Sequence, residues 1–106
     1  MTSYQKFLIV GRTTREPTAN TPEGKTNYAD FVVAVDRRGE GADFFPCRAF
    51  STIANTAAKL KKGALVLVEG RLEISRYTPQ EGEPAKTSIR MLVDFLSIMS
   101  QPAQSG

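Results

Sequence analysis

The sequence predicts an all-β domain with a single helix, and three observations carry this prediction. Five segments have the pattern of a strand: residues 6–12 are a short apolar run, and the other four alternate between two faces with a two-residue period. A further segment, between the third and fourth of these, repeats its apolar residues at helical spacing and ends at Gly63. Gly70 interrupts the apolar face of the fourth strand at mid-length, where a strand in a small barrel bends around a corner. We therefore expect a small closed barrel.

The N-terminal part of the chain predicts two strands joined by a loop. Residues 6–12 form an apolar run closed by Gly11, where a bend or a close backbone approach costs little. Residues 15–25 contain two prolines and a glycine among threonine and asparagine, which is typical of a loop. Residues 27–37 alternate as a second strand, and the glycine-rich segment 38–41 then turns the chain into a hairpin.

Residues 43–50 form the predicted third strand, whose two faces differ in chemistry. One face is small and apolar, fit for a core, and consists of Phe45, Cys47 and Ala49. The other face carries Phe44, Pro46, Arg48 and Phe50. Pro46 has no N–H to donate, so it predicts a bulge or a sheet edge at that position.

The segment that follows, up to Gly63, predicts a helix with Ser51 or Thr52 as its N-cap. Its apolar stripe consists of Ile53, Ala57 and Leu60. Three lysines, Lys59, Lys61 and Lys62, fill the predicted last turn. We expect these lysines mainly to complement the helix dipole, with phosphate contact as a secondary role.

The C-terminal part predicts two long strands joined by a flexible arm. Residues 65–78 form the fourth strand, residues 78–85 the tip of the arm, and residues 86–99 the fifth strand. The expected apolar faces consist of Val66, Val68, Leu72 and Ile74, and of Ile89, Met91, Val93 and Phe95. We expect one domain over residues 1–99 and a short, polar, disordered tail over residues 100–106. Phe7, Phe31 and Phe95 are assigned to the core or to a subunit interface.

Five strands with a helix between the third and the fourth follow the order of an OB-fold, a five-stranded Greek-key barrel. This fold binds oligonucleotides on the face of its second and third strands and with its loops. A cold-shock barrel is the closest competitor, but it lacks the intervening helix. The helical segment therefore favours the OB-fold.

Composition excludes several classes of protein. Fourteen Lys and Arg against eleven Asp and Glu give a formal charge of +3, which permits a nucleic-acid partner without requiring one. One cysteine and no histidine leave no disulfide and no histidine-containing zinc site, so we expect no metal, no cofactor and no enzyme activity. No apolar run is long enough for a signal peptide or a membrane span. We expect a cytoplasmic protein without a membrane partner.

The outward face of the third strand is the candidate binding site. An aromatic, a cation and a second aromatic on one face suit base stacking and phosphate neutralisation, which assigns stacking to Phe44 and Phe50 and phosphate contact to Arg48. Tyr77 is a third stacking candidate, with packing inside the arm as its alternative. Core packing or a dimer interface is the alternative for the two phenylalanines. Tyr4 and Tyr28 stay unassigned.

Further basic residues are groove candidates by position, and for each a solvated surface charge is the alternative. They are Arg12, Arg37, Arg38, Arg71, Arg76, Lys61, Lys62 and Lys86. Their scatter over several predicted strands is typical of a lined groove rather than of a basic tail.

Seven short segments, in this order and spacing, resemble the bacterial single-stranded DNA-binding protein family. They are Ile9-Val10-Gly11-Arg12, Arg15-Glu16-Pro17, residues 29–35, Asp43-Phe44, Leu60-Lys61-Lys62-Gly63, residues 68–72 and Arg76-Tyr77. The resemblance implies an OB-fold, a homotetramer with a dimer as the alternative, and sequence-independent binding of single-stranded DNA in replication, recombination and repair. It places the stacking aromatics at Phe44, Phe50 and Tyr77.

The chain departs from the family pattern at two places. A fourth family aromatic falls at about Gly39, so that platform is lost or replaced by stacking of the neighbouring Arg38. Residues 101–106 contain no acidic and no aromatic residue, so no partner-recruiting tail is expected, either through truncation or through a phage, plasmid, organelle or divergent origin. Two other functions stay open: a replication-restart adaptor that works through protein contacts, and a single-stranded RNA-binding protein.

Overall fold

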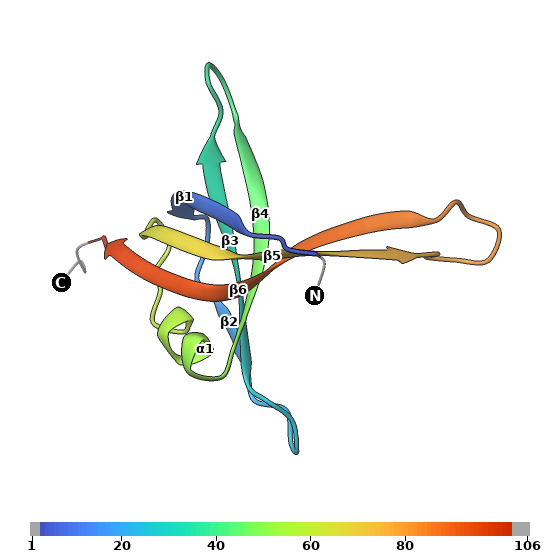
Figure 1. The fold of residues 1–106 in the computed structure, drawn as a ribbon, viewed down its shortest axis with the longest axis horizontal. Helices are drawn as coiled ribbons and strands as arrows, with labels where there is room; N and C mark the ends of the chain where they lie inside the picture. Colours follow the sequence, from blue (N-terminus) through green and yellow to red (C-terminus); the bar gives the residue numbers. More distant parts are fainter. Residues whose placement is uncertain (1–2, 103–106) are drawn as a thin grey trace.

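Six strands and one helix make up residues 3–102, the part of the chain that this computed structural model describes (Figure 1). Their bounds are β1 Phe7–Thr13, β2 Thr18–Asn20, β3 Tyr28–Asp36, β4 Ala42–Phe50, α1 Ser51–Ala57, β5 Leu65–Tyr77 and β6 Lys86–Ser100. The five long strands match the five predicted ones to within about two residues at each end. The helix lies between the third and fourth of them, as predicted.

The strands form one sheet in the order β1-β5-β6-β4-β3-β2, and β1 also pairs with β3, which closes the barrel. This topology confirms the OB-fold. The short strand β2 was missed because it lies in the proline-rich segment predicted to be a loop. It pairs antiparallel with the start of β3, where β1 no longer covers that edge, and so satisfies backbone groups that would otherwise lack partners.

The barrel core follows the alternation of the strands. Buried side chains include Phe31, Val33, Cys47, Ala49, Val66, Val68, Met91 and Val93. Gly70 lies at a register shift between β5 and β6, and a Cβ there would stand 1.9 Å from the Leu92 carbonyl oxygen. Gly11 is equally confined, since its Cβ would lie 2.2 Å from the Ala34 carbonyl oxygen. Gly11 thus allows the close backbone approach that the sequence predicts, and Gly70 allows such an approach where the sequence predicts a bend.

The helix differs from its prediction at both ends. It begins at Ser51 with Phe50 in the N-cap position and no side-chain cap, so neither Ser51 nor Thr52 has the expected role. It ends at Ala57, because the chain tightens into shorter-range hydrogen bonds that turn Leu60 into the core. Lys59, Lys61 and Lys62 follow the end of the helix, so no basic residue occupies its last turn. The predicted interaction of these lysines with the helix dipole is therefore wrong. Gly63 does adopt a positive φ, in the turn that leads to β5.

Beyond Gly70, the hairpin of β5 and β6 leaves the barrel as a long arm (Figure 1). This separation overturns part of the predicted apolar faces. Ile74 and Ile89 pair across the arm and are exposed, because no other element covers that side of the arm. Phe95 is also exposed, since the register shift at Gly70 turns it to the outside of the barrel. It is therefore not a core residue, and a subunit interface remains the prediction for it.

A second apolar surface lies on the outside of β1, β5 and β6. Leu8, Glu69 and Phe95 form one row across these strands, and Val10 and Leu67 lie beside them. Leu8, Val10 and Phe95, together with Met99 near the end of β6, are exposed large apolar side chains. We refer to Leu8, Val10, Leu67, Phe95 and Met99 as the apolar β1–β5–β6 face.

The end of the described chain is more ordered than predicted. Ser100 belongs to β6, and the Gln101 side chain accepts a hydrogen bond from the Lys61 N–H and donates one to the Lys59 carbonyl. The rest of the predicted tail, residues 103–106, lies outside the described residues. The predicted domain boundary at residue 99 stays a prediction. No helix within residues 3–102 is long and apolar enough to span a membrane.

Candidate nucleic-acid interface

The alternation predicted for the third strand is present in β4. Phe45, Cys47 and Ala49 face the barrel interior, while Phe44 and Phe50 are 62% and 40% exposed. Antiparallel pairing with β3 places four residues of that strand beside the outward residues of β4. We call this surface the outer β3–β4 face; it consists of Phe44, Pro46, Arg48 and Phe50 with Ala34, Val32, Asp30 and Tyr28. Core packing is thereby excluded for both phenylalanines.

Pro46 does not shift this pattern. The register between β4 and β3 is continuous at Pro46, so the predicted bulge is absent. The alternative prediction, that Pro46 lies at a sheet edge, is the one that fits. On its other side, β4 pairs with β6 only through Cys47 and Arg48. The β4–β6 pairing thus stops beside Pro46, which has no N–H to donate to a ladder.

Arg48, for which the sequence predicts phosphate contact, forms an ion pair with Asp30. Its Nε and Nη2 donate to the two carboxylate oxygens of Asp30 at 2.7 and 2.9 Å. Its guanidinium carbon also lies 4.1 Å from the centre of the Tyr28 ring. The hydrogen bonds to Asp30 raise the pKa of Arg48. One edge of the guanidinium is therefore fixed, while Nη1 has no partner in the described structure and can donate to a phosphate.

Tyr28 belongs to the same surface, although the sequence left it unassigned. Its ring centre lies 6.3 Å from that of Phe50 at an interplanar angle of 54°, and the Arg48 guanidinium lies over its face. Tyr28 lies on the same side of β3 as Asp30, because the two positions are two residues apart in one strand. The register with β4, which sets Tyr28 opposite Phe50, could not be read from the sequence of one strand.

The corner after Phe50 is held in an uncommon conformation. Ser51 has φ of 56°, the left-handed region that residues with a Cβ seldom adopt. Asn27 holds this corner: its carbonyl accepts from the Ser51 N–H, and its side-chain amide donates to Asn55 Oδ1 at 3.1 Å. Because this clamp directly follows Phe50, it fixes where β4 ends and hence where the Phe50 ring points.

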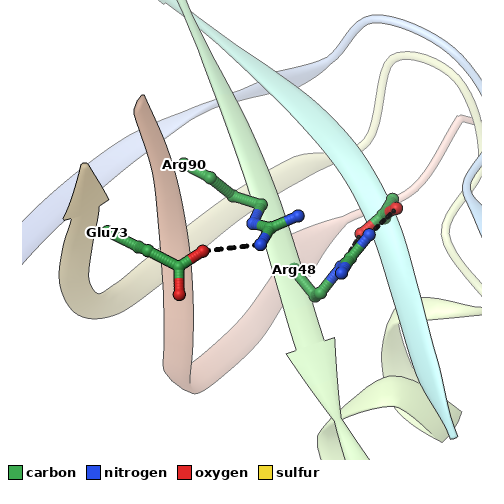
Figure 2. Close-up of polar contacts among 4 residues, drawn as sticks. Arg48, Glu73 and Arg90 are labelled. Carbon is green, nitrogen blue, oxygen red and sulfur yellow. Dashed lines mark hydrogen bonds and ion pairs between the residues drawn. The ribbon is translucent and has the colours of Figure 1, made fainter. Parts of the chain in front are cut away.

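The arm continues this surface away from the barrel. Arg48 is the register partner of Leu92 on β6, and Leu92 is that of Arg71 on β5, so these residues face the same side of the sheet. Two residues further along the arm, Glu73 pairs with Arg90, whose Nη2 donates to Glu73 Oε1 (Figure 2). Tyr77, half exposed, lies on this side next to Lys86.

The other basic candidates divide into four groups. Arg12 joins the outer β3–β4 face at its edge, next to Ala34, and donates to the Gly63 carbonyl. Arg37 is paired with Asp43 at 2.7 Å, and Arg38 lies in the exposed β3–β4 turn. Arg76 alternates with Tyr77 and therefore faces the opposite side of the arm. Lys61 and Lys62 lie in the turn between α1 and β5, directly before Gly63.

The single cysteine, Cys47, is buried in the barrel core. Burial raises the pKa of the Cys47 thiol to about 12, so the thiol stays protonated, and its sulfur donates to the Phe45 carbonyl. Residues 3–102 contain no group of three or more carboxylate or cysteine side chains that could hold a metal ion. The arrangement offers aromatic faces and guanidinium groups, which suits binding of unpaired bases and phosphates.

Comparison with known sequences finds a matching family and several similar proteins. The profile of the single-strand binding protein family matches residues 4–99. The single-stranded DNA-binding protein 1 of Clostridium acetobutylicum is 39% identical over 85 residues, which cover 73% of this chain and 77% of that protein. The single-stranded DNA-binding protein of Thermotoga maritima is 33% identical over 115 residues, which cover 99% and 81%. For a Staphylococcus aureus relative of the same name, 39% identical, the match covers only 54% of its length.

Proposed function

The chain belongs to the single-strand binding protein family, and we propose that it binds single-stranded DNA on the outer β3–β4 face and the adjoining side of the arm. One observation carries this proposal: Phe44 and Phe50 stand exposed on one face of β4, with the Arg48 guanidinium between them. An exposed phenylalanine stabilises the fold much less than a buried one does. A base that stacks on an aromatic ring, in contrast, contributes about 1–3 kcal/mol to the free energy of binding.

The mechanism is binding rather than catalysis. Basic side chains attract the polyanion and release its counterions, so affinity falls as salt rises. Bases then stack on the rings of Phe44, Phe50 and Tyr77, with Arg48 and Lys86 positioned for phosphates. A duplex keeps its bases stacked and offers no free faces, so the chain selects single strands without reading their sequence.

Protection of single strands in replication, recombination and repair is the cellular role that we propose, with the nucleoid as its place in a bacterial cell. The relatives' names support the ligand but say nothing about those processes. The chain spans about half the length of the Staphylococcus aureus relatives. Partners other than single-stranded DNA are therefore proposals as well.

We further propose that copies of the chain associate through the apolar β1–β5–β6 face, as a homotetramer with a dimer as the alternative. Exposed apolar side chains gathered on one sheet face are typical of an interface. The outer β3–β4 face would stay free for DNA, because it lies on different strands. Light scattering of the wild-type chain measures the number of copies, and a monomer at micromolar concentration contradicts this part of the proposal.

Titration of the intrinsic tyrosine fluorescence tests the binding proposal. The chain has three tyrosines and no tryptophan, and Tyr28 and Tyr77 lie on the proposed surface. Poly(dT) should quench this fluorescence tightly at low salt and more weakly at high salt, while duplex DNA should not. Stronger quenching by poly(U) would indicate an RNA-binding protein, and no quenching by either polymer would favour an adaptor that works through protein contacts.

A further inference from the structure

A hollow of about 260 Å³ lies on the outer β3–β4 face where the arm leaves the barrel. Val32 and Pro46 face each other there, one row away from Phe44 and one row away from Arg48. The hollow forms because β4 and β6 stop pairing at Pro46, so that Ile89 of the arm separates from the barrel. It therefore interrupts the path between the two exposed phenylalanines.

Two guanidinium groups line this hollow, and neither was assigned a role by the sequence. Arg15 is held there because the neighbouring Thr14 N–H donates to the Val32 carbonyl. It makes no ion pair with any residue in the described range, and it is exposed. Arg90 lines the hollow from β6. The one carboxylate that lines it, Asp30, is already paired with Arg48.

Arg90 retains unused donors. A guanidinium has five N–H groups, and only Nη2 contacts Glu73. Within residues 3–102, Arg90 Nε is the one buried side-chain nitrogen or oxygen without a hydrogen-bond partner. Glu73 thus fixes the side chain next to the hollow and leaves it able to bind another acceptor (Figure 2).

We propose that the hollow holds one nucleotide of the bound strand. The apolar side chains of Val32 and Pro46 receive the base, and the guanidinium groups of Arg15 and Arg90 receive its phosphate. Guanidinium groups bind phosphate oxygens with two parallel hydrogen bonds, which suits both residues to this role. This inference rests on the proposed function, since the nucleotide belongs to the same single strand.

Four single variants separate phosphate binding from a structural role: Arg15→Gln, Arg90→Gln, Glu73→Gln and Lys25→Gln. Affinity for poly(dT) is measured by tyrosine quenching over a series of salt concentrations, and thermal unfolding checks the fold. Glu73→Gln breaks the same ion pair as Arg90→Gln but keeps the guanidinium. Lys25→Gln removes one positive charge from an exposed turn outside the hollow.

Arg15→Gln and Arg90→Gln should each weaken binding about five- to ten-fold and lower the slope of log affinity against log salt by about 0.7. Glu73→Gln should bind at least as tightly as wild type, and Lys25→Gln should match wild type. Equal losses in Arg90→Gln and Glu73→Gln, or arginine variants that behave like Lys25→Gln, overturn the inference and leave the proposed function intact. Failure of the wild-type chain to bind poly(dT) instead overturns the proposed function.

Discussion

Phe44 and Phe45 are adjacent on β4 and point to opposite faces, so they form a matched pair for alanine substitution. Phe44 is 62% exposed, and its truncation removes little buried area. Phe45 packs against the core and lies 5.5 Å from the Phe7 ring, centre to centre. The two substitutions remove the same atoms from one strand, and they should therefore separate binding from stability.

Phe44→Ala should lose one stacked base, about 1–3 kcal/mol, which corresponds to about 5- to 150-fold in the dissociation constant. Its free energy of unfolding should change by less than about 0.5 kcal/mol. Phe45→Ala should lose about 2 kcal/mol of stability, roughly half of a full core truncation because Phe45 is only partly buried. That loss lowers the melting temperature by about 8–16 °C.

Poly(dT) titrations and thermal melts of both variants measure these two effects side by side. A Phe44→Ala variant that binds as tightly as wild type, or that melts as early as Phe45→Ala, contradicts a binding role for the Phe44 ring. A Phe45→Ala variant that is fully stable but defective in binding would show that the two faces of β4 have been exchanged.

Three further residues, Asp30, Cys47 and Gly70, have predictions of their own. Asp30→Asn should tighten poly(dT) binding, because it removes a negative charge from the outer β3–β4 face and frees Arg48. Loss of this partly exposed ion pair should lower the free energy of unfolding by about 1 kcal/mol. Weaker binding in the same titration would show that Asp30 instead holds Arg48 in its binding position. Cys47 should not react with a thiol reagent at pH 8 until the chain unfolds, since burial raises the pKa of its thiol. The folded-state pKa of about 12 exceeds the ordinary value of 9.0, so the free energy of unfolding should fall as pH rises from about 9 towards 12. A melting temperature that rises over that range contradicts a raised pKa for the Cys47 thiol. Gly70→Ala should lower the melting temperature, since its Cβ would overlap the Leu92 carbonyl and such crowding costs about 1–3 kcal/mol; an unchanged melt would mean that β5 and β6 separate there without cost.

The local pattern of apolar residues was enough to predict the five long strands, and alternation was enough to predict the two faces of β4, because successive side chains in a strand point to opposite faces. Gly11 and Gly70 were also recognisable, since only glycine fits where two backbones approach so closely. The extent of the helix was not predictable from its stripe. Leu60 continues the helical spacing, but it reaches the core through a turn that follows α1.

The composition of the site was only partly predictable. Phe44, Phe50 and Arg48 were found from one strand, whereas the contacts of Arg48 with Asp30 and Tyr28 depend on the register between β3 and β4. Arg15 and Arg90 come from a loop and from the arm, about 75 positions apart in sequence. Their shared hollow follows from the place where the arm leaves the barrel, which no local pattern encodes.

Photocrosslinking tests the central claim most directly. A short single strand carrying 5-iodouracil is bound to the wild-type chain and irradiated, and the attached residues are identified by mass spectrometry. We expect attachment at Phe44, Phe50 or Tyr77, on the outer β3–β4 face and the side of the arm that continues it. Attachment confined to the apolar β1–β5–β6 face, at Leu8 or Phe95, would contradict the account.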